Sequence, residues 1–499
     1  MFIFILLFVL TCVCALVARK SVRVKASPPV YSGALPLIGH AHKMLGDSEC
    51  KLATEQEKKY ESNEKGGVLV LKIVLTDPDD FTTAANQCLK AHFTHNFLKP
   101  WLGDGLVSGT DVPIWKRHRK LLSPAFRQHV LDGFLHIFNT VSNNMVDDLA
   151  KEVGRGPFDH SVYLNWLTLE AVCRKLITFM TAVDKMFHFV TKRIQKWWLH
   201  SDLLYSVTKQ KKEQNEVVSY LNGISKTVSI LYYCVRQILW LIKTLCKELH
   251  RLFITGTKFK AFVDLALELA DRGELTDTEV YEEMNTIIAA GYETTGKALM
   301  YTLLLLGSHA NVQNKAYEEL YSVFGDSKRD VEKQDLSKLV YLEAVLKESM
   351  RVYTITPSMF RCVDSDVKLK ILFKKILTFL CILFENYTMP AGSNCLLFVC
   401  GLHRHPSWGP DVDQFRPERW LDQATADPDA AVHKAFAAFG VGKRLCLGQT
   451  YAMMSMKTTL AHMLRQYRVS SDVTQLKLKM DPLLKPVSGH EITIELRNI

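Results

Sequence analysis

Cys446 is the residue whose surroundings most clearly indicate chemistry. It lies in a glycine-rich stretch, Phe439-Gly440-Val441-Gly442-Lys443-Arg444-Leu445-Cys446-Leu447-Gly448, and the apolar periodicity of residues 451–464 predicts a helix directly after it. The positive N-terminal end of that helix, with Lys443 and Arg444, would lower the pKa of the thiol and favour a thiolate. A thiolate binds metal ions, so the stretch predicts a cysteine-ligated metal. A structural cysteine in a glycine turn is the competing interpretation.

Two further stretches could serve such a metal site. Trp115 and Arg119 are four residues apart and share one face of a predicted helix, where an indole and a guanidinium donor would suit a carboxylate. In residues 289–295, Ala-Ala-Gly-Tyr-Glu-Thr-Thr, the adjacent Glu293 and Thr294 could carry protons. This stretch lies within a predicted helix over residues 276–307, where a glycine costs about 1 kcal/mol relative to alanine. A threonine hydroxyl bonded to the i−4 carbonyl would loosen that helix further.

These stretches together resemble one protein family. The pattern Phe439-x-x-Gly442-x-Arg444-x-Cys446-x-Gly448 is similar to the haem-binding loop of the cytochrome P450 monooxygenases. Residues 115–119 resemble the family's propionate-binding helix, and residues 289–295 resemble its oxygen-activation helix. The resemblance implies a mainly α fold with small β-regions, in which haem b is held by Cys446 as the proximal iron ligand.

The resemblance also implies roles for the other site residues. Those that would contact the haem or its propionates are Trp115, Arg119, Arg361, Phe439, Arg444 and Gly448. Glu293 and Thr294 would form the distal proton relay. The chain otherwise resembles most the fatty-acid ω-hydroxylase and insect xenobiotic branch, where a glutamate that can esterify the haem often precedes the glycine of the oxygen helix. Ala290 stands at that position here, so no covalent haem link is expected.

Glu348 and Arg351 form an acid–base pair on a helix predicted over residues 341–353. Such a pair alone is most often a surface ion pair of small energy. In the family, however, a Glu-x-x-Arg pair joins a later arginine in a buried network behind the haem, and Arg419 in Phe415-Arg416-Pro417-Glu418-Arg419-Trp420 matches it. The resemblance therefore assigns these three residues to structure.

Composition favours one large catalytic unit in a reducing compartment. The 499 residues are 48% hydrophobic with a net charge of +10, and no linker rich in Pro, Gly or Ser divides residues 40–499. The 12 cysteines show no paired spacing, which argues against a disulfide framework. The positive charge suits an anionic membrane surface or an acidic partner, and nothing indicates nucleic acid.

The N-terminus predicts a membrane anchor. Residues 1–18 carry no charge, and Arg19, Lys20, Arg23 and Lys25 follow, so residues 1–20 are interpreted as a transmembrane helix with the body on the cytosolic side. A cleaved signal peptide is the competing interpretation, but a basic n-region is lacking. Residues 21–39, with Pro28-Pro29, form a basic, proline-rich hinge. By resemblance the protein would lie in the endoplasmic reticulum membrane, in contact with lipid.

The expected partners follow from the same resemblance. A lipophilic substrate and O2 would be the reactants, and electrons would come from NADPH through a flavoprotein reductase, with cytochrome b5 as a further candidate donor. No nucleotide-binding glycine loop is evident in the chain, which agrees with an external donor. Lys116, Arg117 and Lys120 would form a docking patch for the reductase, or they are ordinary solvated charges.

Two apolar runs, residues 228–254 and 370–384, do not fit the family pattern. The first is a buried or interfacial helix rather than a second membrane span, because charged residues interrupt it. The second separates two flanks that would otherwise form a hairpin, and so it is interpreted as an insertion. Both could be non-coding sequence retained in the gene model. Two alternatives to a monooxygenase therefore stay open: a catalytically impaired haem-binding membrane protein, and a haem-thiolate isomerase or dehydratase.

Overall fold

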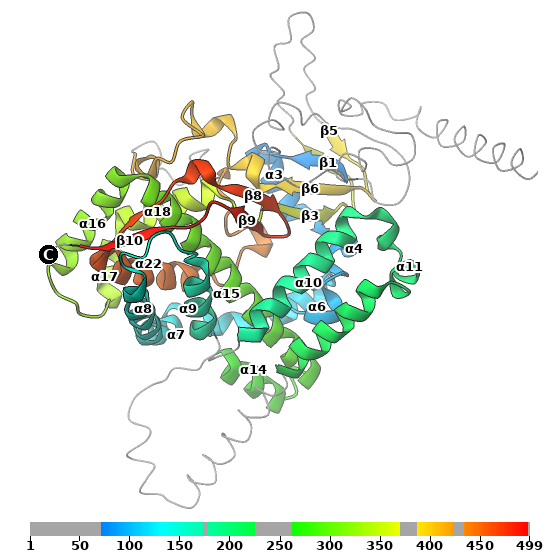
Figure 1. Cartoon of the computed structure of the whole chain (residues 1–499). Coiled ribbons are helices and arrows are strands. Elements are labelled where there is room, and N and C mark those ends of the chain that lie inside the picture. Colours follow the sequence, from blue (N-terminus) through cyan, green and yellow to red (C-terminus); the bar gives the residue numbers. More distant parts are fainter. Residues whose placement is uncertain (1–70, 173–176, 225–261, 370–386, 423–433, 498–499) are drawn as a thin grey trace, which may run out of the picture.

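The computed structural model describes residues 71–172, 177–224, 262–369, 387–422 and 434–497, and most of these residues are helical. Figure 1 shows helices gathered around α15, with β1, β3 and β6 together at one side and β8, β9 and β10 running across the middle and left of the view. The prediction of a mainly α fold with small β-regions is confirmed for the described residues. The predicted anchor (1–20), the hinge (21–39) and the apolar runs 228–254 and 370–384 lie outside them. Among the described helices, none is long and apolar enough to cross a bilayer.

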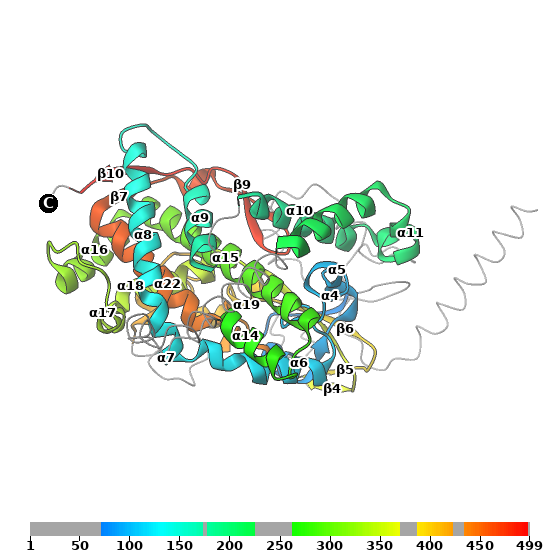
Figure 2. The same ribbon diagram turned by 90° about the horizontal axis from the view of Figure 1, so that it is seen from below.

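Helix α15, Asp277–Ser308, is the element on which the others pack. It begins at a capping box: the Thr276 hydroxyl accepts the N–H of Glu279 at 3.2 Å, and the Glu279 carboxylate accepts the N–H of Thr276 at 2.8 Å. In Figure 2 it runs diagonally from the region of α8 (Leu135–Leu149) and α9 (Ser161–Val172) to that of α6 (Val112–Leu122) and α14 (Phe262–Asp271). The predicted helix over residues 276–307 is thus confirmed to within one residue at each end.

The largest apolar core lies between α15, α8, α9, α18 (Val340–Val352) and α22 (Gln449–Gln466). Its centre includes Phe138, Leu303, Leu346 and Leu460, each no more than 1% exposed. Burying each such side chain contributes about 1.5–3 kcal/mol. Because α22 follows the cysteine loop directly, this core fixes the start of the loop's helix against the rest of the protein.

A four-stranded sheet lies beside the helices in the order β1-β6-β3-β2. Its strands are β1 (Leu71–Leu75), β6 (Asn394–Phe398), β3 (Ser358–Cys362) and β2 (Leu89–Lys90), and β1 runs parallel to β6. Helix α3, Pro78–Gln87, begins at Asp77, whose carboxylate accepts the N–H groups of Asp79 and Asp80. The sheet places Arg361 of β3 between Cys395 of β6 and Lys90 of β2.

Strand β4, Val367–Leu369, pairs antiparallel with β5, Tyr387–Met389. The expectation that the flanks of the second apolar run form a hairpin is confirmed. Two other two-stranded sheets involve the C-terminal part of the chain. They pair β8 (Lys477–Met480) with β9 (Leu484–Ser488), and β7 (Tyr467–Ser470) with β10 (Thr493–Leu496).

The segment between residues 93 and 113, whose Gly103, Gly105 and Gly109 are typical of a loop, is partly helical. It contains two short helices, α4 (His92–His95) and α5 (Lys99–Leu102), and only residues 103–111 form an irregular loop before α6. Beyond this segment, α10 (Ile177–Gln195) and α11 (Asp202–Ser206) extend away from the helical core (Figure 1). Other described α-helices include α7 (Gln128–Leu131), α16 (Ala310–Phe324), α17 (Lys333–Lys338) and α19 (Val399–Leu402), and residues 209–224 are also helical.

Candidate functional site

The cysteine loop closes on itself just before α22. The N–H of Cys446 donates to the carbonyl of Phe439 at 2.8 Å, and Phe439 packs against the main core. Gly442 has φ 69°, and a Cβ there would lie 2.3 Å from Asn86 Oδ1, so only glycine fits at that point. Gly448 is the N-cap of α22. The loop therefore holds the sulfur at the beginning of a helix that is itself fixed by the core.

The electrostatics of the thiol differ from the sequence-based expectation. Cys446 as a residue is exposed, yet enough protein surrounds its sulfur that burial raises the pKa of the thiol. The Gly448 N–H and the Arg119 guanidinium partly offset this. The prediction that Lys443 and Arg444 lower this pKa is therefore wrong for the polypeptide alone. The charge that faces the sulfur comes from α6.

Arg444 instead packs on Trp115 of α6. The guanidinium lies 3.6 Å from the centre of the indole ring, and Nη1 donates to the carbonyl of Gly109 at 3.3 Å. Trp115 is buried, and Arg119 follows one turn later on the same helix. Burial and the neighbouring charges of Arg361 and Arg119 lower the pKa of Arg444 to about 10. Arg444 thus lies on the Trp115 indole and close enough to Arg361 and Arg119 to be affected by their charge.

Arg361 on β3 adds a buried cation to this group. It is 3% exposed, its Nη1 donates to the carbonyl of Phe360 at 3.0 Å, and its Nε has no hydrogen-bond partner. Among the described residues, no carboxylate pairs with Arg361, Arg444 or Arg119. Buried guanidinium groups normally face an anion. The donor set therefore fits a bound group that carries carboxylates.

Lys90 and His95 also belong to this region, and the sequence analysis missed both. Lys90 lies opposite Arg361 in the β2–β3 pairing, and its amine donates to the carbonyls of Leu106 and Val107. Burial, Arg444 and Arg361 hold the pKa of Lys90 well below its usual range, and burial with Lys90 lowers the pKa of His95 to about 3. Only the strand register could have indicated Lys90, and the local sequence does not specify it.

Glu293 and Thr294 lie in the middle of α15 but in different surroundings. The Thr294 hydroxyl donates to the carbonyl of Ala290 at 2.7 Å, which is the expected i−4 bond, and Ala290 itself is exposed. Glu293 is 3% exposed, and Lys297 Nζ lies 3.3 Å from its carboxylate. Burial raises the pKa of Glu293, although Lys297 and Lys485 partly offset that effect.

A separate buried network joins the Glu348–Arg351 pair to Arg419. Glu348 accepts two hydrogen bonds from Arg351, at 2.8 and 2.9 Å, and one from Arg419 Nε at 2.9 Å. The indole of Trp420 adds a fourth donor at 2.9 Å. All three charged residues are at most 3% exposed. The network ties α18 to the segment containing residues 416–420, and the sequence analysis had missed only Trp420.

Comparisons with known proteins agree with this arrangement. The family model described as "Cytochrome P450" matches residues 70–494. This chain belongs to the cytochrome P450 family. Family membership makes it a haem-thiolate monooxygenase that uses O2, a substrate and a redox partner. The buried Arg361, the half-buried Arg119 and Arg444 and the cysteine loop fit haem.

Animal cytochromes P450 are among the most similar curated relatives. "Cytochrome P450 4V2" of Mus musculus is 28% identical and covers 96% of this chain and 92% of its own length. "Cytochrome P450 4g15" of Drosophila melanogaster is also 28% identical, covering 93% and 91%. A solved cytochrome P450, CYP102L1, aligns over 85% of this chain and 89% of its own with a TM-score of 0.66 and 20% identity, which supports the fold.

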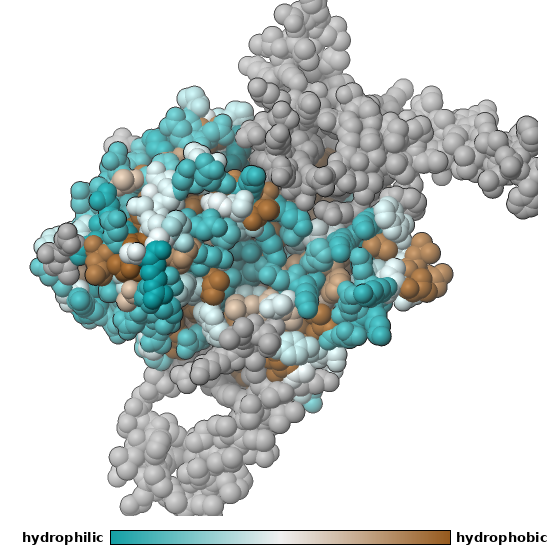
Figure 3. Space-filling model, viewed as in Figure 1, coloured by the Kyte–Doolittle hydropathy of each residue, from teal (hydrophilic) through white to brown (hydrophobic). Residues whose placement is uncertain are grey.

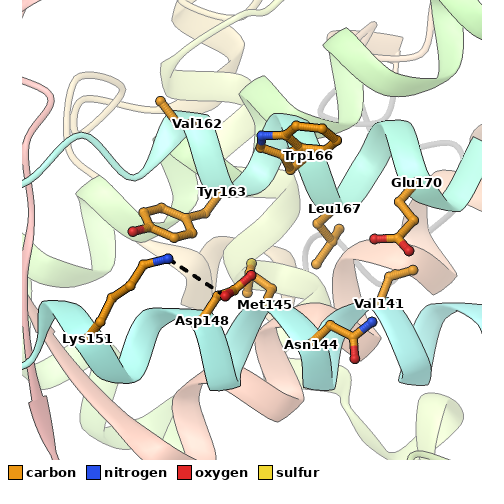
Figure 4. A pocket seen from close by; sticks show the side chains of 10 residues that line it. All are labelled: Val141, Asn144, Met145, Asp148, Lys151, Val162, Tyr163, Trp166, Leu167 and Glu170. Atoms are coloured by element: carbon orange, nitrogen blue, oxygen red, sulfur yellow. Dashed lines mark ion pairs between the residues drawn. The ribbon is translucent and has the colours of Figure 1, made fainter. Parts of the chain in front are cut away.

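This cytochrome P450 also has a cavity of about 320 Å³ between α8 and α9 (Figure 4). Tyr163 of α9 lies beside Asp148 of α8 and Lys151, which follows α8, and these two form an ion pair at 3.7 Å. None of the residues that line this cavity is a predicted site residue. The cavity is therefore separate from the cysteine and arginine groups.

Proposed function

We propose that the protein is a membrane-associated monooxygenase that inserts one oxygen atom of O2 into a lipophilic substrate, using NADPH electrons delivered by a flavoprotein reductase. The observation that carries this proposal is the grouping of the buried Arg361 with the half-buried Arg119 and Arg444, none paired with a carboxylate of the described residues, near the sulfur of the family's cysteine loop. Haem b, when bound, supplies the activation of O2, which no side chain can perform.

The residues of this chain would hold haem b in two ways. Cys446 would bind the iron as a thiolate, and Phe439 and Gly448 would shape the loop around it. Trp115, Arg119, Arg361 and Arg444 would donate to the propionates, since guanidinium and indole N–H groups suit carboxylates. The metal's charge would favour the thiolate despite the burial that raises the thiol's pKa in the polypeptide.

Glu293 and Thr294 would deliver protons. A carboxyl with a raised pKa retains a proton that it can give up, and Lys297 holds it in place. The Thr294 hydroxyl, less buried than Glu293, would pass that proton on, using the Ala290 carbonyl to fix its orientation. An isomerase or dehydratase would not need this pair, which favours oxygen insertion.

The surroundings of α15 favour an apolar substrate. Trp101 of α5, Met186 and Phe189 of α10 and Ile288 of α15 belong to one buried apolar cluster. These side chains offer few polar groups to a ligand beside the oxygen helix. The chemistry that such a surface recognises is that of a hydrocarbon chain or ring.

An apolar surface at the tip of α10 and α11 supports a membrane contact. Leu203, Leu204 and Val207 are 78%, 53% and 83% exposed, and Figure 3 shows the apolar patch that includes α11. Arg193 fixes this tip from inside, since its guanidinium lies 4.1 Å from the ring centres of both Phe97 and Tyr205. Such a patch is suited to the apolar edge of a lipid surface. With residues 1–20 as an anchor, it would place the protein on the endoplasmic reticulum membrane, with the body in the cytosol.

A reductase would dock on the exposed lysines near the cysteine loop. Lys116 and Lys120 of α6 and Lys443 of the loop are exposed, and they form no ion pair among the described residues. Arg117, which the sequence analysis grouped with them, instead pairs with Glu279 and donates to the Glu274 carbonyl at 2.8 Å. The proposed docking patch therefore consists of the three lysines, for an acidic surface of the reductase or of cytochrome b5.

One set of measurements tests the function. The full chain, expressed with haem, should give the carbon monoxide difference spectrum of a thiolate-ligated ferrous haem. With a flavoprotein reductase and NADPH, one atom of isotopically labelled O2 should enter the product of a substrate selected by spectral titration. Product formed without consumption of O2 would indicate an isomerase. A spectrum without the thiolate band would indicate an impaired haem protein.

A further inference from the structure

Glu283 of α15 contacts two other parts of the protein at once. Its side chain is fully buried. Oε1 lies 2.8 Å from Nδ1 of His118 on α6, and Oε2 accepts the N–H of Leu106 at 3.2 Å. One carboxylate therefore joins the oxygen helix, the helix that carries Trp115 and Arg119, and the loop between α5 and α6.

The imidazole of His118 lies between two carboxylates. It is 0% exposed, and its Nε2 lies 3.1 Å from Glu279 Oε1 while Nδ1 faces Glu283. Both ring nitrogens act as donors only in the charged imidazolium. The other charged groups close to this contact are Arg117 on α6, Glu282 on α15, Asp104 in the loop and Lys90 on β2. Two acids face the ring directly, so the geometry favours the imidazolium.

The loop formed by residues 103–110 is bound from two sides. On the α15 side, Glu282 accepts the N–H of Asp104 at 3.1 Å in addition to the Glu283 bond to Leu106. A Cβ at Gly105 would lie 2.4 Å from Thr286 Oγ1, so the loop backbone lies directly against the helix. On the other side, the Lys90 amine and the Arg444 guanidinium donate to loop carbonyls. Carboxylates thus bind the N–H groups, and cations bind the carbonyls.

We propose that Glu283 is a positioning residue that fixes both loop 103–110 and the propionate-binding helix to the oxygen helix. Through it, Trp115 and Arg119 keep a constant placement relative to Thr294. The roles of these three residues rest on the proposed function, but the contacts of Glu283 do not. Loss of its negative charge would leave either His118 or the Leu106 N–H without its acceptor, which is costly in a buried site.

Hydrogen–deuterium exchange of the purified full-length protein tests this placement directly. Glu283→Gln should increase exchange about tenfold in peptides covering residues 103–110 and in the first half of α6, because both lose a charged acceptor. The matched control is Glu319→Gln. Glu319 of α16 accepts the N–H groups of Tyr341 and Leu342 at 2.6 and 2.9 Å, so its loss should affect the start of α18 and leave the loop unchanged.

A pH series separates positioning from general destabilisation. After correction for intrinsic exchange, loop protection in the unmodified chain should fall as the pH rises and His118 loses its proton, whereas in Glu283→Gln it should not change with pH. His118→Gln retains the bond between Glu283 and the Leu106 N–H, so it should increase exchange in α6 more than in the loop. It serves as the second variant if the Glu283→Gln protein cannot be produced in folded form. Equal protection of the loop in Glu283→Gln and the unmodified chain would overturn the proposal. The carbon monoxide spectrum, recorded separately, reports whether the haem assignment itself fails.

Discussion

Leu369 and Tyr387 lie opposite each other in the antiparallel pairing of β4 and β5, although residues 370–386 separate them along the chain. The next pair, Lys368 with Thr388, continues the same register. The chain thus leaves the hairpin and returns to it at paired positions. The two strands that flank the apolar run therefore pair directly with each other.

This pairing predicts that residues 370–386 are dispensable. Replacing them with an Asn-Gly turn should preserve the fold and haem content, because a two-residue loop of this type closes an antiparallel pair directly. Circular dichroism and the haem spectrum measure the outcome. A control with the same turn and Leu369 deleted should lose stability, because a one-residue slip moves every strand side chain to the opposite face. Loss of the fold in the chain with the short turn would show that residues 370–386 are an integral part of the protein. Sequencing the transcript would show separately whether these residues are encoded.

Replacement of Cys446 should remove thiolate ligation. Cys446→Ala deletes the proposed iron ligand, and the ferrous carbon monoxide spectrum should lose its thiolate band. The control is Cys400→Ala, at a buried cysteine of α19 outside the loop. An unchanged spectrum in Cys446→Ala would refute the assignment of the iron ligand.

The hydroxyl of Thr294 should be needed for productive use of O2. Thr294→Val keeps the shape but removes the bond to Ala290 and the proton relay. Product formation should fall about 10²-fold or more while NADPH is still consumed and peroxide is released. Thr302→Val is a matched control, because Thr302 makes the same bond to Ala298 at 2.7 Å on the same helix but is fully buried. Equal uncoupling in both variants would point to helix distortion as the cause.

The Glu348 network should be essential for stability. Glu348→Gln removes the carboxylate that pairs with the buried Arg351 and one of the two that face Arg419, the other being Asp411 at 3.2 Å. It should lower the free energy of unfolding by about 3–5 kcal/mol. Asp148→Asn breaks the exposed pair with Lys151 and should change it by less than about 1 kcal/mol. Denaturant titration of both variants gives the comparison. Similar small losses would mean that the network is not isolated from water.

The contact between His118 and Glu279 should stabilise the protein in a limited pH range. Burial alone would lower the pKa of His118, but its bonds to Glu283 and Glu279 outweigh that and raise it above 6.5. The stability that the protonated His118 gives the folded protein is therefore fully present below pH 6.5. It is lost as the pH rises through the pKa of His118 in the folded state.

Glu279 sets the acid limit of the same range. Burial raises the pKa of this carboxyl, yet the Thr276 N–H and His118 outweigh it and lower the pKa from 4.5 to about 2. The stability that the ionised Glu279 gives the folded protein is fully present above pH 4.5. It is lost as the pH falls toward the lowered pKa of about 2. Unfolding measured against pH should therefore show the full effect between 4.5 and 6.5. In His118→Gln, the decrease on the alkaline side should be weaker, and an identical decrease would assign it to another group.

The elements around the site could be predicted because their signals are local. The pattern of residues 276–307 predicts the helix that is α15, and the spacing of Trp115 and Arg119 indicates a shared helix face. Each of these depends on residues within one or two helical turns. Hydrophobic periodicity gave the helix lengths for the same reason.

The contacts that were missed join residues far apart in the chain. His118 meets Glu283 across 165 positions, and Lys90 reaches Arg361 through strand register. In neither pair does the sequence around one residue indicate which residue is its partner. The direction of the Cys446 pKa was also wrong, because local charge indicated stabilisation of the thiolate, whereas desolvation depends on how closely the whole fold surrounds the sulfur.

The grouping of Arg119, Arg361 and Arg444 has a consequence for how the protein is made in a cell. Arg119 and Arg361 both repel Arg444, and this repulsion opposes folding. Propionates bound there as proposed would offset it, so haem that binds only the folded chain would shift the balance toward folding by mass action. The quantity of folded enzyme would then depend on porphyrin supply as well as on translation, and a host short of haem would make more chains that quality control degrades.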